Sequence, residues 1–202
     1  IVLVRPEGMD HLPELTPRLA LKKAGDRIFM GNKVAGRYTL RYVDDPESDI
    51  VMLSTGTGEA PHNNMVAQLL RNGHKGRIVS ACTVRYQRDL AYLETHRRLE
   101  KLYPQYSYFA LTTREADTIN NKVYIQDMIT NGMLADVLGH EPSPDRTQFF
   151  LCGNPLMIGF PEWDGETPTF PEPRGVCEIL TELGFTVDHK GVDGNVHYEE
   201  YW

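Results

Sequence analysis

The chain has 202 residues, a formal net charge of −7, and 41% hydrophobic and 24% charged residues, which is the composition of an ordinary soluble globular protein. The acidic balance argues against nucleic acid as a general partner, although a local basic pocket for phosphate remains compatible with it. No apolar run approaches the ~20 residues that a membrane-spanning helix needs. The length allows one large domain, or one complete domain with part of another.

The three cysteines lie far apart in the sequence, at Cys82, Cys152 and Cys177, with no Cys-x-x-Cys pair. An odd number at this spacing argues against a disulfide framework or a zinc site and favours a reducing compartment, most simply the cytoplasm. The histidines are scattered without metal-binding spacing.

Residues 1–45 are expected to be rich in β-structure. The expected strands are 1–4, 27–31 and 37–43. Between them, residues 15–21 predict a short helix that is capped by Thr16 and has Pro17 at its first position. Because these few elements cannot close a core, we expect them to be the end of a β-barrel. The chain opens on a strand without a methionine, so further sequence is expected upstream.

From residue 46 to the end, strand and helix patterns alternate. The predicted strands are 50–53, 77–82, 106–111 and 148–151, and the predicted helices are 60–71, 90–102, 124–133 and 175–183. This alternation is typical of an α/β domain with a parallel sheet and right-handed crossovers. Residues 159–174 interrupt the pattern with four prolines and predict a surface excursion.

Two glycine turns follow predicted strands. Thr55-Gly-Thr-Gly-Glu-Ala-Pro61 follows 50–53, and Cys152-Gly-Asn-Pro155 follows 148–151. A strand, a glycine turn and a helix N-terminus form a favourable place for a phosphate. Neither a Walker A loop nor a Gly-x-Gly-x-x-Gly fingerprint is present. Ligands of such sheets bind beyond the carboxyl ends of the strands, so both turns should face one crevice. The first turn alone could equally be an ordinary strand-to-helix connection.

Taken together, the motifs resemble the carboxyl-terminal part of the bacterial-type ferredoxin/flavodoxin–NADP reductase family. The matching segments are Leu15-Thr-Pro-Arg-Leu19, Gly36-Arg-Tyr-Thr-Leu40, Thr55 to Pro61, Val84-Arg-Tyr-Gln-Arg-Asp-Leu-Ala-Tyr-Leu93, Thr113-Arg-Glu115, Leu151-Cys-Gly-Asn-Pro-Leu-Met157 and Glu200-Tyr-Trp202.

This resemblance implies an NADP-binding α/β domain over 46–202, preceded in 1–45 by the last strands of an antiparallel FAD-binding β-barrel. It implies FAD and NADP as cofactors, and a ferredoxin or flavodoxin as the transient electron-transfer partner. Hydride would pass between the nicotinamide C4 and the flavin N5. The family's main FAD-holding motif, Arg-x-Tyr-Ser, would lie upstream of Ile1.

The resemblance also implies roles for individual residues. The turn from Thr55 through Gly56 and Thr57 to Gly58, together with Gly153, would line the pyrophosphate and nicotinamide side of the crevice. Cys152 would lie beside the nicotinamide ring, where a small polarisable thiol can touch the ring without blocking it. Without the family, a buried strand-end cysteine is the simpler interpretation.

Arg85, Arg114 and Lys122 match the positions that hold the adenosine 2′-phosphate in the family, and guanidinium groups bind phosphate through paired hydrogen bonds. Three solvated surface cations are the alternative. The family usually has a Gly-Arg pair where this chain has Asn121-Lys122.

By the same resemblance, Leu15 and Thr16 would contact FAD close to Thr57, and Tyr201 and Trp202 would flank it. A terminal strand that packs on the core is the alternative for Trp202. Glu59 departs from the family's small or apolar residue. It is either a pocket carboxylate or, the interpretation we favour from sequence, a first-turn acid that the helix dipole stabilises.

Three functions are compatible with these patterns. The first is an electron-transfer enzyme that acts between NADP(H) and a ferredoxin or flavodoxin. The second is the reductase component of an oxygenase or another diaphorase that uses NADH. The third is a nucleotide-binding module that lacks flavin.

Overall fold

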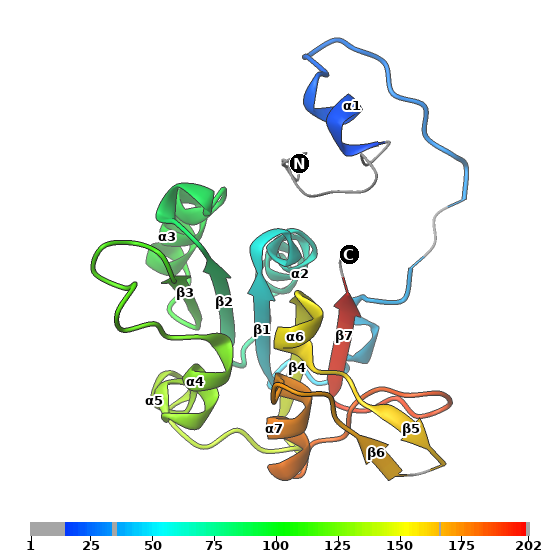
Figure 1. Ribbon diagram of the computed structural model, residues 1–202, viewed down its shortest axis with the longest axis vertical. Helices are drawn as coiled ribbons and strands as arrows, with labels where there is room; N and C mark the ends of the chain where they lie inside the picture. The colour runs from blue at the N-terminus through cyan, green and yellow to red at the C-terminus, as the bar shows by residue number, and fades with distance from the viewer. Residues whose placement is uncertain (1–14, 34–35, 166, 201–202) are drawn as a thin grey trace. The chain divides into compact units, whose positions relative to one another are not determined.

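The computed structural model describes residues 15–33, 36–165 and 167–200, and the chain divides into two compact units, residues 1–37 and 38–202. The first unit contains helix α1 (Thr16–Ala20), which is drawn in blue in Figure 1. The helix begins at Thr16 and Leu15 takes the N-cap position. The expected cap at Thr16 was therefore wrong by one residue, while the helix itself is confirmed.

The strands expected at 27–31 and 37–43 are not formed, and the one expected at 1–4 lies outside the described residues. The segment 27–31 is irregular and leaves Phe29 94% exposed, and 37–43 contains the short 3-10 helix η1 (Leu40–Tyr42). A strand is stabilised by backbone hydrogen bonds to a neighbour. Among the described residues, no strand pairs with either segment. The apolar pattern alone therefore overpredicted them.

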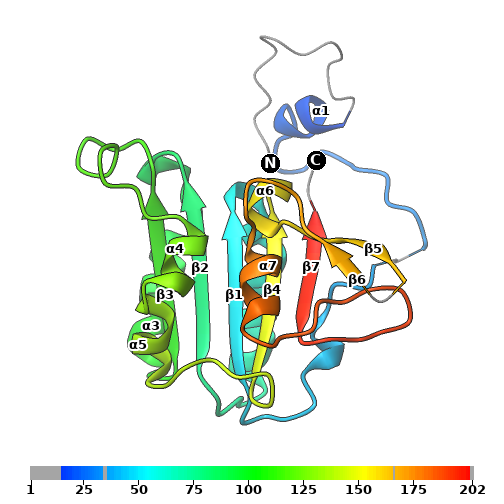
Figure 2. The ribbon, with the colours of Figure 1, turned by 60° about the horizontal axis from the view of Figure 1, so that its bottom comes forward.

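The second unit is built on a parallel five-stranded sheet with the order β3-β2-β1-β4-β7. Its strands are β1 (Asp49–Thr55), β2 (Ile78–Val84), β3 (Tyr106–Thr112), β4 (Thr147–Gly153) and β7 (Val196–Glu200). Figure 2 shows the five arrows pointing the same way, so all carboxyl ends lie along one edge. This arrangement confirms the predicted α/β class and parallel sheet.

Helices cover both faces of the sheet. One face packs against α2 (Glu59–Arg71), α3 (Leu93–Leu102) and the segment around η1, and the other against α4 (Ile125–Thr130), α5 (Met133–Leu138), α6 (Pro155–Ile158) and α7 (Val176–Glu182). Alternate residues of each strand face opposite layers: Ile50 and Met52 face one core, and Val51 and Leu53 face the other. Burial on both sides explains why the strands read as continuous apolar runs.

Three details differ from the sequence expectations. The helix expected at 124–133 ends early, and α5 begins after Gly132, which has a φ of +84° that favours glycine. The excursion at 159–174 contains a small antiparallel pair, β5 (Glu162–Asp164) and β6 (Thr167–Thr169). Strand β7 was not predicted, because its alternation is masked by polar residues. Among the described residues, no helix has the length and apolar character that crossing a bilayer requires.

Candidate functional site

The two glycine turns are in direct contact at the carboxyl edge of the sheet. The first forms the short 3-10 turn η2 (Gly56–Gly58) between β1 and α2, and the second ends β4. A Cβ atom on Gly58 would lie 2.1 Å from the Cys152 carbonyl oxygen, and one on Gly153 would lie 2.3 Å from Thr55 Oγ1. The backbone N–H of Asn154 donates to that same hydroxyl at 2.7 Å. Only glycine fits where the two turns meet.

The outer part of the first turn is exposed to solvent. Gly56 and Thr57 are exposed, while Gly58 and Glu59 are buried. Gly56 has a φ of +54°, which a residue with a side chain adopts at a cost, and a Cβ there would meet nothing within 4 Å. The N-terminus of the thirteen-residue helix α2 follows directly. This is an arrangement of exposed backbone and positive helix dipole that suits an anion.

Cys152 lies at the end of β4 and is fully buried. Burial, with a smaller contribution from the charge of Glu199, raises the pKa of the Cys152 thiol to about 12. The residue is therefore a neutral thiol at neutral pH, and a thiolate nucleophile has no support here. Its carbonyl lies against Gly58, so β4 and the glycine turn pack closely.

Arg85 and Arg114 lie next to each other, beyond the ends of β2 and β3. The Arg114 N–H donates to the Arg85 carbonyl at 2.9 Å, and the Gln87 N–H donates to Glu115 Oε1 at 2.7 Å. Both arginine side chains are exposed, and neither forms an ion pair with any residue that the structure describes. The backbone hydrogen bond, here called the Arg85–Arg114 clasp, joins the ends of β2 and β3, and the shared phosphate role of the two side chains stays a prediction.

The remaining predicted residues are Lys122, Leu15, Thr16, Tyr201 and Trp202. Lys122 is exposed on the loop between β3 and α4, and no contact joins it to the two arginines in the described part of the chain. Leu15 is 66% exposed in the first unit, beside Thr16. Tyr201 and Trp202 lie outside the described residues, directly after β7. The phosphate role of Lys122 and the FAD roles of the other four stay predictions.

Sequence reasoning missed a buried polar cluster behind the first turn. Glu59 stands in the first turn of α2, as expected, but the residue is only 4% exposed, and its carboxylate accepts a hydrogen bond from Tyr108 Oη at 2.5 Å. His96 Nε2 lies 3.2 Å from the same carboxylate oxygen. The helix dipole therefore does not by itself account for Glu59. The one signal of this cluster in the sequence was an acidic residue at a position where the family commonly has a small or apolar one.

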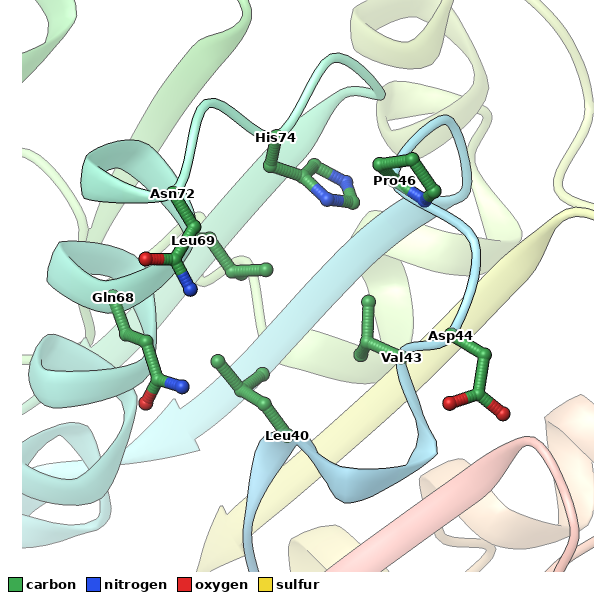
Figure 3. Close-up of a pocket in the computed structure, with 8 residues that line it drawn as sticks. All are labelled: Leu40, Val43, Asp44, Pro46, Gln68, Leu69, Asn72 and His74. Carbon is green, nitrogen blue, oxygen red and sulfur yellow. The ribbon is translucent and has the colours of Figure 1, made fainter.

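A separate small pocket, drawn in Figure 3, lies at the other end of α2. It has a volume of about 170 Å³ and lies between the helix and the segment that carries Leu40 and Val43. Gln68 and Asn72 border it near the end of α2, whereas the glycine turn precedes the beginning of that helix. This pocket is therefore distinct from the glycine-turn edge.

Known proteins resemble this chain both in structure and in sequence. The solved ferredoxin NADP⁺ reductase from Neisseria gonorrhoeae with bound FAD and NADP aligns with a TM-score of 0.61 at 20% identity, over 82% of this chain and 61% of that one. The flavodoxin/ferredoxin–NADP reductase of Shigella flexneri is 31% identical over 147 residues, which is 72% of this chain and 58% of that protein. A component of the Na⁺-translocating NADH-quinone reductase of Pseudomonas aeruginosa is 25% identical over 181 residues, 89% of this chain and 40% of the relative.

The chain thus spans little more than half the length of the reductase that it matches at 31% identity. Residues 52–162, more than half of the chain, match the family described as the oxidoreductase NAD-binding domain. That segment contains both glycine turns, both arginines and the buried Glu59 cluster. The chain therefore belongs to the oxidoreductase NAD-binding domain family, and its named reductase relatives agree with the resemblance that its motifs carry.

Proposed function

We propose that this chain is the NADP(H)-binding part of a flavin-dependent oxidoreductase that moves electrons between NADP(H) and a ferredoxin or flavodoxin. The observation that carries the proposal is the joined pair of glycine turns beside the Arg85–Arg114 clasp, on one edge of the sheet. Backbone amides for a pyrophosphate and unpaired guanidinium groups for a further phosphate are the donor set that NADP requires.

Each part of the dinucleotide is assigned to residues of this edge. The exposed Gly56 and Thr57 would receive the pyrophosphate, and Arg85 and Arg114 would hold the adenosine 2′-phosphate. Lys122 would add a third cation from its exposed loop. Cys152 and Gly153 would flank the nicotinamide at the end of β4, where a small strand-end residue leaves room for a ring.

The flavin side of the proposal rests on the family rather than on contacts. Leu15, Thr16, Tyr201 and Trp202 would line the FAD, and residues 1–45 would be the end of the FAD-binding barrel. When bound, FAD supplies an acceptor for hydride at its N5 and releases electrons one at a time. The task of the present residues is to bind and orient the nicotinamide and to exclude water from it. Three buried free cysteines are consistent with a reducing, cytoplasmic setting.

Binding of NADP⁺ and NAD⁺ to the purified chain, measured by calorimetry, tests the nucleotide assignment. We expect NADP⁺ to bind more tightly, and Arg114→Ala to weaken NADP⁺ binding by about tenfold or more while NAD⁺ binding changes little. Arg98→Ala is a matched control, because Arg98 is an exposed arginine on α3 away from the clasp. Unaltered NADP⁺ affinity in Arg114→Ala would contradict the 2′-phosphate assignment.

A second candidate, a reductase component or diaphorase that uses NADH, is supported by the similarity to the NADH-quinone reductase component. Equal or tighter binding of NAD⁺ in the same experiment would favour it. The flavin-free module is distinguished by visible absorbance. Protein that binds NADP⁺ but shows no flavin absorption band, even after incubation with FAD, would support that third function.

A further inference from the structure

The buried Glu59 cluster joins the glycine turn to three other elements. The Glu59 backbone N–H donates to the carbonyls of Gly56 and Thr57, so this residue closes the turn and begins α2. Its side chain reaches β3, where Tyr108 Oη donates to Oε1 at 2.5 Å. On β2, the Cys82 thiol donates to the Gly56 carbonyl at 3.7 Å. The turn and Glu59 are therefore held against β2 and β3.

His96 completes the cluster from α3. It is 1% exposed, its imidazole stacks on the Tyr108 ring at 4.0 Å and 11°, and its Nδ1 lies 2.7 Å from Tyr106 Oη. Its Nε2 lies 3.2 Å from Glu59 Oε1, off the axis of an aligned hydrogen bond. The two side chains are therefore in contact without an aligned hydrogen bond.

The charges around Glu59 are few. Within the described residues, the titratable groups of this cluster are Tyr108 and Tyr106 on β3, Cys82 on β2 and His96 on α3. Of these four, only His96 can carry a positive charge. Arg97 and Glu100 stand further out: the Arg97 guanidinium lies 5.9 Å from the Tyr108 ring centroid, and Glu100 accepts the Tyr108 N–H.

A buried carboxylate at this position opposes the function of the turn. An acid in the first turn of a helix reduces the positive potential that a pyrophosphate would meet there. An uncompensated buried charge is also costly to the protein itself. A positively charged imidazole beside the carboxylate would offset both effects, because its charge opposes the negative potential that the carboxylate adds at the turn.

We propose that Glu59 and His96 form a charge-compensated pair behind the glycine turn, and that this pair sets the affinity of the turn for a pyrophosphate; the inference rests on the proposed function. Both are positioning residues, because they act on the ligand through the backbone of the turn. Tyr108 holds the Glu59 carboxylate in place through its hydrogen bond. The effect should be confined to the pyrophosphate, because the proposed function assigns the 2′-phosphate to the Arg85–Arg114 clasp.

A double-mutant cycle tests the pair, because the sign of the coupling between the effects of the Glu59 and His96 substitutions on Kd distinguishes the possibilities. His96→Asn keeps an amide near the Nδ1 position for Tyr106 and removes the Nε2 that faces Glu59. We expect it to raise the Kd for NADP⁺ and for inorganic pyrophosphate by about tenfold. Glu59→Gln keeps an acceptor for Tyr108 and removes the charge, so the double variant Glu59→Gln/His96→Asn should return both Kd values to within about twofold of the unmodified protein.

A merely structural role predicts the opposite, because two losses of packing would add in the double variant. Adenosine 2′-monophosphate, which carries the 2′-phosphate but no pyrophosphate, is the control ligand, and its Kd should stay the same in every variant. Thermal unfolding first establishes that each variant is folded. If His96→Asn does not fold, Tyr108→Phe replaces it, because loss of the Oη releases the carboxylate toward the turn and should also weaken pyrophosphate binding.

The outcomes separate this inference from the proposed function. The pair is overturned, while the proposed function stands, if NADP⁺ binding is unchanged in folded His96→Asn. The same holds if the double variant binds NADP⁺ more weakly than His96→Asn does. If the unmodified protein binds neither NADP⁺ nor pyrophosphate, both proposals fail. Rescue in the double variant, with adenosine 2′-monophosphate unaffected, supports the pair.

Discussion

The two edges of the parallel sheet treat charge in opposite ways. At the amino edge, Asp49 is fully buried and accepts hydrogen bonds from Arg146 Nε at 2.9 Å and from the Arg77 N–H at 3.0 Å, while His140 Nε2 lies 3.0 Å away. At the carboxyl edge, Arg85 and Arg114 are exposed and have no ion-pair partner among the described residues. Asp49 is thus paired within the protein, whereas the two arginines are free to take the phosphate that the proposed function assigns to them.

Under the proposed function, stability and ligand binding belong to opposite edges of the sheet. Removing one partner of a buried ion pair destabilises the protein, and a carboxylate that is paired in this way offers nothing to a ligand. Unpaired cations beside an exposed glycine turn contribute little to stability, yet they supply binding energy once a phosphate arrives. Substitutions at the amino edge should therefore change stability alone, and substitutions of the arginines should change affinity alone.

Gly58→Ala should have the largest effect, because it damages both properties. Its Cβ would lie 2.1 Å from the Cys152 carbonyl oxygen, so the two turns must separate. We expect a loss of about 3 kcal/mol in the free energy of unfolding, measured by urea denaturation, and loss of detectable NADP⁺ binding. Gly56→Ala is the matched control: its Cβ meets nothing within 4 Å, and the strain of its positive φ should cost about 1 kcal/mol.

Asp49→Asn tests the internally paired edge. It removes the negative charge that Arg146 and His140 face, and we expect the free energy of unfolding to fall by about 2 kcal/mol. The Kd for NADP⁺ should not change, because the residue lies at the opposite end of β1 from the glycine turn. Asp145→Ala, at an exposed neighbouring acid, serves as the control. A weakened NADP⁺ affinity in Asp49→Asn would break the separation of the two edges.

His62 is a buried titratable group on α2, so it tests whether burial of an ionisable side chain near the glycine turn makes stability depend on pH. Burial lowers the pKa of His62 to about 3, so the unfolded chain takes up a proton near pH 6.5 that the folded protein does not bind. Its contribution to stability is therefore complete above pH 6.5 and is lost as the pH falls toward 3. Between pH 6.5 and 5 the loss should be about 2 kcal/mol.

The measurement is the free energy of unfolding as a function of pH in the unmodified protein and in His62→Gln, which does not titrate. The variant should retain a partner for the Tyr38 hydroxyl, which lies 2.7 Å from His62 Nε2. Parallel pH profiles for the two proteins would count against a neutral, buried His62.

The cysteines should show the smallest effect. All three are buried and free, and burial raises the pKa of Cys82 and of Cys152 to about 12 and that of Cys177 further. Native protein at pH 8 should therefore resist alkylation by iodoacetamide, while denatured protein takes up three adducts, as counted by mass spectrometry. Rapid labelling of Cys152 in native protein would show that the end of β4 opens to solvent.

Local pattern predicted the core of the second unit well. The apolar runs at 50–53 and 148–151 became the central strands β1 and β4, because strands buried on both faces need continuous apolar residues. The same reasoning failed at 27–31, where an apolar run has no strand partner among the described residues and stays exposed. Local pattern also predicted one continuous helix over 124–133, although the backbone at Gly132 adopts a left-handed conformation.

The sequence by itself determined the parallel α/β class, the two glycine turns and the two candidate arginines, because those features depend on periodicity, residue type and the order of strands. Only the tertiary structure decided that Gly58 contacts Cys152, that Arg114 bonds to Arg85 and that Glu59 is buried against Tyr108 and His96. Each of these contacts joins residues at least 29 positions apart in the chain. Such contacts follow from how strands and helices pack, which no local pattern records.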